Sequence, residues 1–250
     1  MKLLVIVLCL LSERFLIHMS SHHRFEWFEP YANSFSKKLP EKGMWANGWV
    51  RLAALILPII TVSSLIFFFL NNVAFGFASL IFNILLFYYC LGPQNPFYPK
   101  RQHTEHEITP DEVGAYLADV NGQLFTVIFW YIVIGPIGIL AYRMISLSRS
   151  LNITKPAASL LTALLDWIPA KMTSFLYLLV GNFQAGLSYF LKYFFMSPEA
   201  NRLMLIQCGL QAVEKEQESQ MLLPQAETLV EHAVIVLLVF LAIFTMVAWL

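Results

Sequence analysis

The sequence predicts an all-α fold: a polytopic transmembrane helical bundle of about five spans, or six, with amphipathic helices at the membrane surface. Of the 250 residues, 58% are hydrophobic and 13% are charged, whereas soluble domains carry about 25% charged residues. Residues 52–99 and residues 233–250 contain no charged side chain. The first of these runs is about twice the roughly 20 residues that one span needs. We expect one integral membrane domain over residues 1–250.

The N-terminus predicts an uncleaved first helix over residues 3–19. Lys2 and the apolar run after it resemble a signal peptide, but no small-residue cleavage site follows, and Glu13 and Arg14 come at once. Because charges are costly at membrane depth, this pair is expected to face other helices. Zero net charge argues against nucleic acid as a partner. Three cysteines give neither a disulfide framework nor a zinc spacing.

The charge-free run predicts a helical hairpin over residues 52–70 and 73–91, with Asn71 and Asn72 in the turn. Gly92 and Pro93 are stop signals for its second helix.

A further helix is expected to begin after Thr109, which is a suitable N-cap. Pro110 suits the first helical position, and Glu112 completes a capping box. The helix leads into a span over residues 124–142. Gly135 and Pro136 interrupt that span and are expected to kink it.

Residues 164–172 put an acid and a base into apolar surroundings. Pro169 predicts that a helix ends or kinks near Ile168, which leaves Asp166 and Lys171 facing the inside or the polar mouth of a bundle. The alternative is an interfacial bend in which Asp166 caps the next turn and Lys171 reaches the lipid headgroups. Whether residues 157–195 span the membrane, re-enter it or lie on its surface stays open.

The C-terminal part predicts two more helices. Ser197 and Pro198 open an amphipathic helix over residues 199–221. Pro224 ends this segment, and residues 233–250 form the final span.

Polar side chains near the ends of the apolar helices predict one polar cavity near the membrane surface. The alternative is a set of structural charge pairs at the membrane boundary. No catalytic role is assigned to these residues. The candidates are Glu13, Arg14, Asn121, Tyr142, Arg143, Asp166 and Lys171.

No metal and no cofactor are expected. His103 and His106, with Glu105 and Glu107 between and beside them, offer metal-binding side chains but lack a defined zinc signature and belong to a loop of turn composition. The sequence contains no phosphate-binding loop, nucleophile elbow or HExxH motif.

Three stretches together resemble one family. Residues 89–93 (YCLGP), residues 129–143 (FW…GPIG…YR) and residues 165–171 (LDWIPAK) resemble, in order and spacing, segments of the AmpE family of bacterial inner-membrane proteins. The resemblance covers nearly the whole chain. It implies a multi-pass protein of the bacterial inner membrane that takes part in signalling in the response to β-lactams, including β-lactamase induction and cell-wall stress.

The AmpE family is distantly related to the CobD/CbiB membrane proteins, which form an amide with aminopropanol in cobalamin synthesis. This chain lacks their PHPV-type segment after the first helix, and it has Lys171 where both families tend to have arginine, which an ammonium group replaces poorly. A non-enzymatic regulator is therefore expected, with a CobD/CbiB-like ligase as the first alternative. A small-solute transporter is the second, although no internal repeat is apparent. Expected partners are the lipid bilayer, a cell-wall-derived or other small-molecule ligand, and a membrane or cytoplasmic signalling protein.

Overall fold

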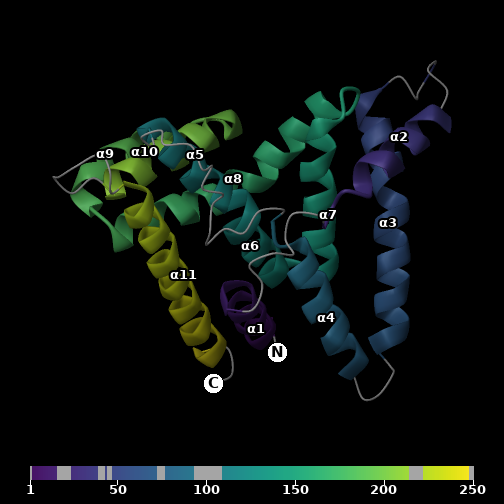
Figure 1. The fold of residues 1–250 in the computed structure, drawn as a ribbon, viewed down its shortest axis with the longest axis horizontal. Helices are drawn as coiled ribbons and strands as arrows, with labels where there is room; N and C mark the ends of the chain where they lie inside the picture. Colours follow the sequence, from purple (N-terminus) through teal and green to yellow (C-terminus); the bar gives the residue numbers. More distant parts are fainter. Residues whose placement is uncertain are drawn as a thin grey trace. The chain divides into compact units, whose positions relative to one another are not determined.

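The computed structural model describes residues 2–15, 24–38, 43, 47–71, 77–92, 109–213 and 222–247, and every regular element in these ranges is helical (Figure 1). The predicted all-α class is confirmed. The chain divides into two compact units. Unit 1 comprises Met1–Pro93 with Val127–Leu165, and unit 2 comprises Gln94–Thr126 with Asp166–Leu250. The expectation of a single domain over residues 1–250 stays a prediction, and each unit is described by itself.

Three of the described helices are long and apolar enough to cross a membrane, judged by length and composition: Gly48–Leu70, Lys155–Val180 and Leu223–Val247. They belong to α3 (Gly48–Asn71), α8 (Lys155–Val180) and α11 (Leu222–Val247). Many of their hydrophobic side chains are exposed, as contact with lipid requires. Phe244 of α11, for example, is 71% exposed. The chain is therefore a helical protein with at least three helices that could cross a membrane.

Unit 1 is built on the predicted hairpin of α3 and α4 (Phe77–Cys90). Helix α7 (Pro136–Leu147) packs against both, α1 (Lys2–Phe15) packs against α4, and α2 (Phe28–Lys38) contacts α3 (Figure 1). Phe87 and Tyr131 are buried in the core, with ring centroids 4.8 Å apart in an edge-to-face arrangement. The two predicted helices are present and contact each other, although α4 begins at Phe77 and Asn71 ends α3; residues 72–76, which include the predicted turn residue Asn72, lie outside the described residues.

The predicted helix start at Thr109 is confirmed by α5 (Pro110–Val120). The Thr109 side chain accepts from the Glu112 backbone N–H at 3.4 Å, and the Glu112 carboxylate accepts from the Thr109 N–H at 3.1 Å. This reciprocal pair satisfies two of the donors that a helix start leaves without partners.

The expected kink at Gly135 and Pro136 is a complete break. After α5 follow a π-helical turn, η4 (Asn121–Phe125), and α6 (Thr126–Val133), which ends before the glycine. Gly135 has φ +98°, a conformation that side-chain-bearing residues rarely adopt. Pro136 then opens α7, which is followed by η5 (Ser148–Ser150).

Helix α8 runs through Pro169 without ending, so the expectation that a helix ends near Ile168 is wrong, and the expected kink stays a prediction. Proline has no N–H, and the carbonyl of Leu165, four residues earlier, therefore has no donor within the helix. The indole N–H of Trp130 donates to the Leu165 carbonyl oxygen at 3.2 Å. Neighbouring side chains that bond to such freed carbonyls are one reason why apolar helices tolerate proline.

Unit 2 contains the second part of α8, α9 (Phe183–Phe194), η6 (Pro198–Ala200), α10 (Asn201–Val213) and α11. Helix α10 is central, since it packs against α5, α9 and α11. Ser197 and Pro198 take the expected N-cap and N1 positions, although the first turn is a 3-10 turn and the serine side chain makes no capping bond.

Pro224, which was expected to end a helix, lies in the first turn of α11. The N–H groups of a first helical turn have no partners within the helix, so a proline there removes no bond. Residues 214–221, part of the predicted amphipathic helix, lie outside the described residues.

Candidate functional site

A buried polar chain in unit 2 begins at the π-helical turn η4. The Thr126 backbone N–H donates to the Asn121 carbonyl, five residues back, where an α-helix would bond four residues back. The turn thus holds one extra residue and changes which side chains share a face. Such π-turns occur frequently at functional sites. The Asn121 residue is only 2% exposed, so its side-chain amide needs partners inside the protein.

Three hydrogen bonds give Asn121 and its neighbours those partners. The Thr173 hydroxyl donates to Asn121 Oδ1 at 2.8 Å, and Asn121 Nδ2 donates to Thr126 Oγ1 at 3.2 Å. The Thr126 hydroxyl then donates to Asp166 Oδ1 at 3.1 Å. All three hydrogen bonds of this polar chain therefore point in the same direction, towards the Asp166 carboxylate. An ionised carboxylate has only acceptor sites, which suits the end of such a chain.

The four members of this polar chain differ in exposure. Asn121, Thr126 and Thr173 are buried, whereas Asp166 is half-buried. This polar chain therefore connects the interior of unit 2 with a half-buried carboxylate. A cation or a hydrogen-bond donor that approached Asp166 would compete with the Thr126 hydroxyl, and the change would reach the buried amide through two further bonds.

Lys171 lies against aromatic rings. Its ammonium nitrogen is 3.7 Å from the ring centroid of Trp167, one turn earlier in α8, and 4.7 Å from that of Phe194 in α9. Both distances are within the range of cation–π attraction. The rings thus stabilise the charge in a segment whose remaining side chains are mostly apolar.

Arg143 stabilises the C-terminal end of α4 in unit 1. Its Nε and Nη2 groups donate to the Cys90 carbonyl oxygen at 2.9 and 2.7 Å, and Arg143 is buried. The last carbonyls of a helix have no donors within it and carry partial negative charge, so a guanidinium suits this place. Tyr142 is buried beside it, with its ring 5.9 Å from the guanidinium carbon.

Glu13 pairs with Arg24, also in unit 1. The Glu13 side chain is fully buried, and its Oε2 accepts from Arg24 Nη2 at 2.9 Å. Arg24 Nη1 donates to the Tyr88 carbonyl at 3.0 Å, near the end of α4 where Arg143 also binds. A buried ion pair with additional hydrogen bonds avoids leaving either charge uncompensated. The expectation that Glu13 faces other helices is thus consistent with these contacts.

The predicted cavity residues fall into both units. Asp166, Lys171 and Asn121 belong to unit 2, where Thr126 links the carboxylate to the amide. The members in unit 1 are Glu13, Arg14, Tyr142 and Arg143, and the Arg14 side chain lies outside the described part of the structure. A single cavity that unites the two groups stays a prediction.

The prediction from sequence missed Thr126 and Thr173 as members of the polar chain. Thr173 lies two helical turns after Asp166 in α8, on the same helical face, and this spacing could have indicated it. Thr126 is five residues after Asn121, a spacing that does not share a face in a regular α-helix. Only the π-helical turn brings these two side chains together.

No protein-family model, curated protein or solved structure matches the chain. The family resemblance of residues 89–93, 129–143 and 165–171 therefore remains an expectation, and support for a function comes from the contacts within each unit.

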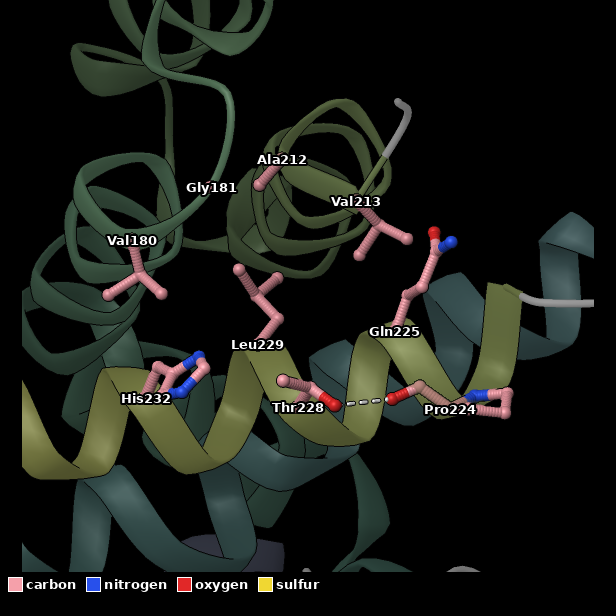
Figure 2. A pocket seen from close by; sticks show the side chains of 9 residues that line it. All are labelled: Val180, Gly181, Ala212, Val213, Pro224, Gln225, Thr228, Leu229 and His232. Carbon is pink, nitrogen blue, oxygen red and sulfur yellow. Dashed lines mark hydrogen bonds between the residues drawn. The ribbon is translucent and has the colours of Figure 1, made fainter. Parts of the chain in front are cut away.

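A cavity of about 500 Å³ lies in unit 2 between the end of α8, the end of α10 and the first turns of α11 (Figure 2). This volume is in the range of small-molecule pockets. Figure 2 shows Leu229 rising from α11 between apolar neighbours, with the imidazole of His232 one turn along. The Thr228 hydroxyl donates to the Pro224 carbonyl at 2.9 Å. The lining consists of Val180, Gly181, Ala212, Val213, Pro224, Gln225, Thr228, Leu229 and His232.

Within the described ranges, no group of three or more His, Cys, Asp or Glu side chains is placed to hold a metal ion. The histidines and glutamates of residues 103–107 lie outside the described residues.

Proposed function

We propose that the chain is a regulatory protein of the bacterial inner membrane of the AmpE type, which acts in the response to β-lactams. The observation that carries this proposal is a set of contacts between the stretches that resemble the family. Arg143, from the second stretch, donates to the Cys90 carbonyl of the first. Trp130, also from the second stretch, donates to the Leu165 carbonyl, with which the third begins.

Both contacts supply a donor to a backbone carbonyl that has none within its own helix. Cys90 lies at the end of α4, and Pro169 deprives the Leu165 carbonyl of its helical donor. Each acceptor thus lacks a partner within its own helix, and each donor comes from a stretch tens of residues away. Residues that depend on one another in this way are expected to be retained together in a family that shares this fold, which is the support for the proposal.

We further propose that the protein crosses the membrane several times, in five or six spans. α3, α8 and α11 supply the spans with sufficient length and hydropathy. The additional spans would involve α1 and α4, which have 14 residues each, and α6 with α7. At about 1.5 Å per residue a helix of that length covers about two thirds of a hydrocarbon core of about 30 Å, so flanking residues must complete these crossings.

The ligand would be a small molecule, such as a cell-wall-derived fragment, and the output would pass to a membrane or cytoplasmic signalling protein. Two features of unit 2 support a small-molecule ligand. The cavity of about 500 Å³ has a suitable size, and the half-buried Asp166 connects by hydrogen bonds to the buried Asn121. Neither feature requires a covalent step, in keeping with a non-enzymatic role.

The test is β-lactamase induction in a bacterial strain whose gene for this chain is deleted. We expect altered induction by a β-lactam in the deletion strain, restoration by the wild-type chain, and weaker restoration by Asp166→Asn. The matched control is Thr245→Val, because the Thr245 hydroxyl bonds to the Leu241 carbonyl within its own helix and Thr245 does not line the cavity. Immunoblots of isolated membranes establish that the variants are present in equal amounts.

A second assay separates the regulatory proposal from the enzymatic one. The same gene is introduced into a CobD-deficient host that requires cobalamin. Growth without added cobalamin would overturn the regulatory proposal in favour of an amide-forming enzyme. Unchanged β-lactamase induction in the deletion strain would also overturn it.

A further inference from the structure

Helix α9 carries a polar stripe beside its apolar side chains. Gln184, Ser188 and Lys192 follow one another at intervals of four residues, and all three are at least partly exposed. Because an α-helix has about 3.6 residues per turn, this spacing places them in one stripe along the helix.

Beside the polar stripe, α9 has an exposed apolar side. Phe183 is 40% exposed and Leu191 is 58% exposed. Directly after the helix, Phe195 is 88% exposed. A single exposed apolar side chain is common in soluble proteins, but this side continues onto an exposed apolar face of α8. The exposed members of that face of α8 are Trp167, Ile168, Met172, Phe175 and Leu179.

Helix α9 also packs against protein. A Cβ atom on Gly186 would lie 2.1 Å from the Leu178 side chain of α8, so the two helices approach closely at this point. The Phe175 ring is 6.4 Å from that of Phe183 and 6.1 Å from that of Phe190. Phe183 thus belongs to the packed side as well as to the exposed one, whereas Leu191 and Phe195 are exposed beyond these contacts.

Helix α9 is shorter than α1 and α4, the helices proposed above as spans that flanking residues complete. Its 12 residues measure about 18 Å at about 1.5 Å per residue, against a hydrocarbon core of about 30 Å. It follows α8, a helix capable of crossing the membrane, after only Gly181 and Asn182. The medium nearest to its exposed apolar side is thus the lipid that contacts α8.

We infer that α9 lies in the headgroup region of the bilayer, with Phe183, Leu191 and Phe195 in the acyl chains. The polar stripe then faces the lipid phosphates and water, where the Lys192 ammonium finds negative charge. Amphipathic helices with aromatic and basic residues bind at this depth.

This inference rests on the membrane placement proposed above and is independent of the signalling role. It selects a surface helix over a second span for the residues after α8. The occupant of the exposed apolar side is lipid, and no protein partner is needed to cover it.

The test measures depth with nitroxide labels in the full chain, reconstituted in nanodiscs of phosphatidylethanolamine and phosphatidylglycerol. Single cysteines replace Leu191, Phe195, Ser188 or Lys192. Collision rates with oxygen, which concentrates in lipid, and with a water-soluble nickel complex are compared. We expect the oxygen-to-nickel ratio to be several-fold higher at positions 191 and 195 than at positions 188 and 192.

The natural cysteines Cys9, Cys90 and Cys208 are buried, and burial raises the pKa of the Cys208 thiol to about 12, which keeps it unreactive. They are nevertheless replaced by alanine, and the label-free parent is measured alongside. A label at Val62, which is exposed on α3, reports on membrane insertion itself.

If the label at Val62 reports contact with lipid, two results at the other positions would overturn the inference. Nickel access at all four positions would mean that α9 lies in water, and lipid access at all four would mean that it re-enters the core. Nickel access at Val62 would overturn the membrane placement and the position of α9 with it. Altered β-lactamase induction is measured separately, so failure of the signalling proposal is distinguishable from each of these results.

Discussion

The passage of α8 through Pro169 depends on one side chain, and a double-mutant cycle can measure this dependence. Trp130→Phe removes the indole N–H that donates to the Leu165 carbonyl at 3.2 Å and keeps most of the ring. The carbonyl is then left without its donor, which we expect to lower the free energy of unfolding by about 1–2 kcal/mol. This is the lower part of the range for buried groups, because the bond is only partly buried.

Pro169→Ala supplies the N–H that the helix lacks, so that residue 169 can donate to the Leu165 carbonyl. In this background the carbonyl no longer needs Trp130. The loss of ring packing in Trp130→Phe is the same in both backgrounds and cancels. We therefore expect a coupling energy of about 1 kcal/mol between the two substitutions, within the range seen for residues that share a hydrogen bond.

The assay is unfolding in mixed micelles of dodecyl maltoside and sodium dodecyl sulfate, followed by far-UV circular dichroism. Circular dichroism is preferred to fluorescence because a tryptophan is altered. Trp49→Phe is the control, since Trp49 is exposed at the start of α3, and it should change stability by less than about 0.5 kcal/mol. Additivity of the two substitutions within about 0.5 kcal/mol would refute the role assigned to Trp130.

Two further predictions concern unit 2. Thr126→Val keeps the shape of the side chain but removes the link between the Asn121 amide and the Asp166 carboxylate, and it should cost about 1–3 kcal/mol in the same unfolding assay. A cost equal to that of Thr245→Val would contradict this prediction. Gly181→Ala would place a Cβ atom 2.4 Å from the Ala212 carbonyl oxygen, so it should destabilise the protein by about 1–3 kcal/mol. A Gly181→Ala protein with unchanged unfolding would show that the turn can move away from α10.

The sequence by itself determined the features that depend on neighbouring residues. The all-helical class follows from composition and apolar run length. The start of α5 follows from a capping box within four residues, Thr109 to Glu112. The break between α6 and α7 follows from Gly135 and Pro136, whose backbone preferences act locally. Such features need no knowledge of the tertiary structure, because their hydrogen bonds and steric limits are set within one turn of chain.

Only the tertiary structure decided which partners the polar groups have. Proline predicts a helix end because it removes one backbone bond, but a donor 35 residues away replaces that bond at Leu165. Asp166 meets the Thr126 hydroxyl, 40 residues earlier, because a π-helical turn shifts the helical face. Arg143, one of the residues expected to line a polar cavity, donates to the Cys90 carbonyl, 53 residues earlier.

The physical reason is the same in each case. A sequence shows which groups require a hydrogen-bond partner, because burial without one is costly. It does not show which distant donor the packing of helices will bring within hydrogen-bond distance, since that choice depends on the paths of all helices in a unit at once. The need for partners at Asp166, Arg143 and Leu165 could thus be inferred from the sequence, and their identity came from the fold.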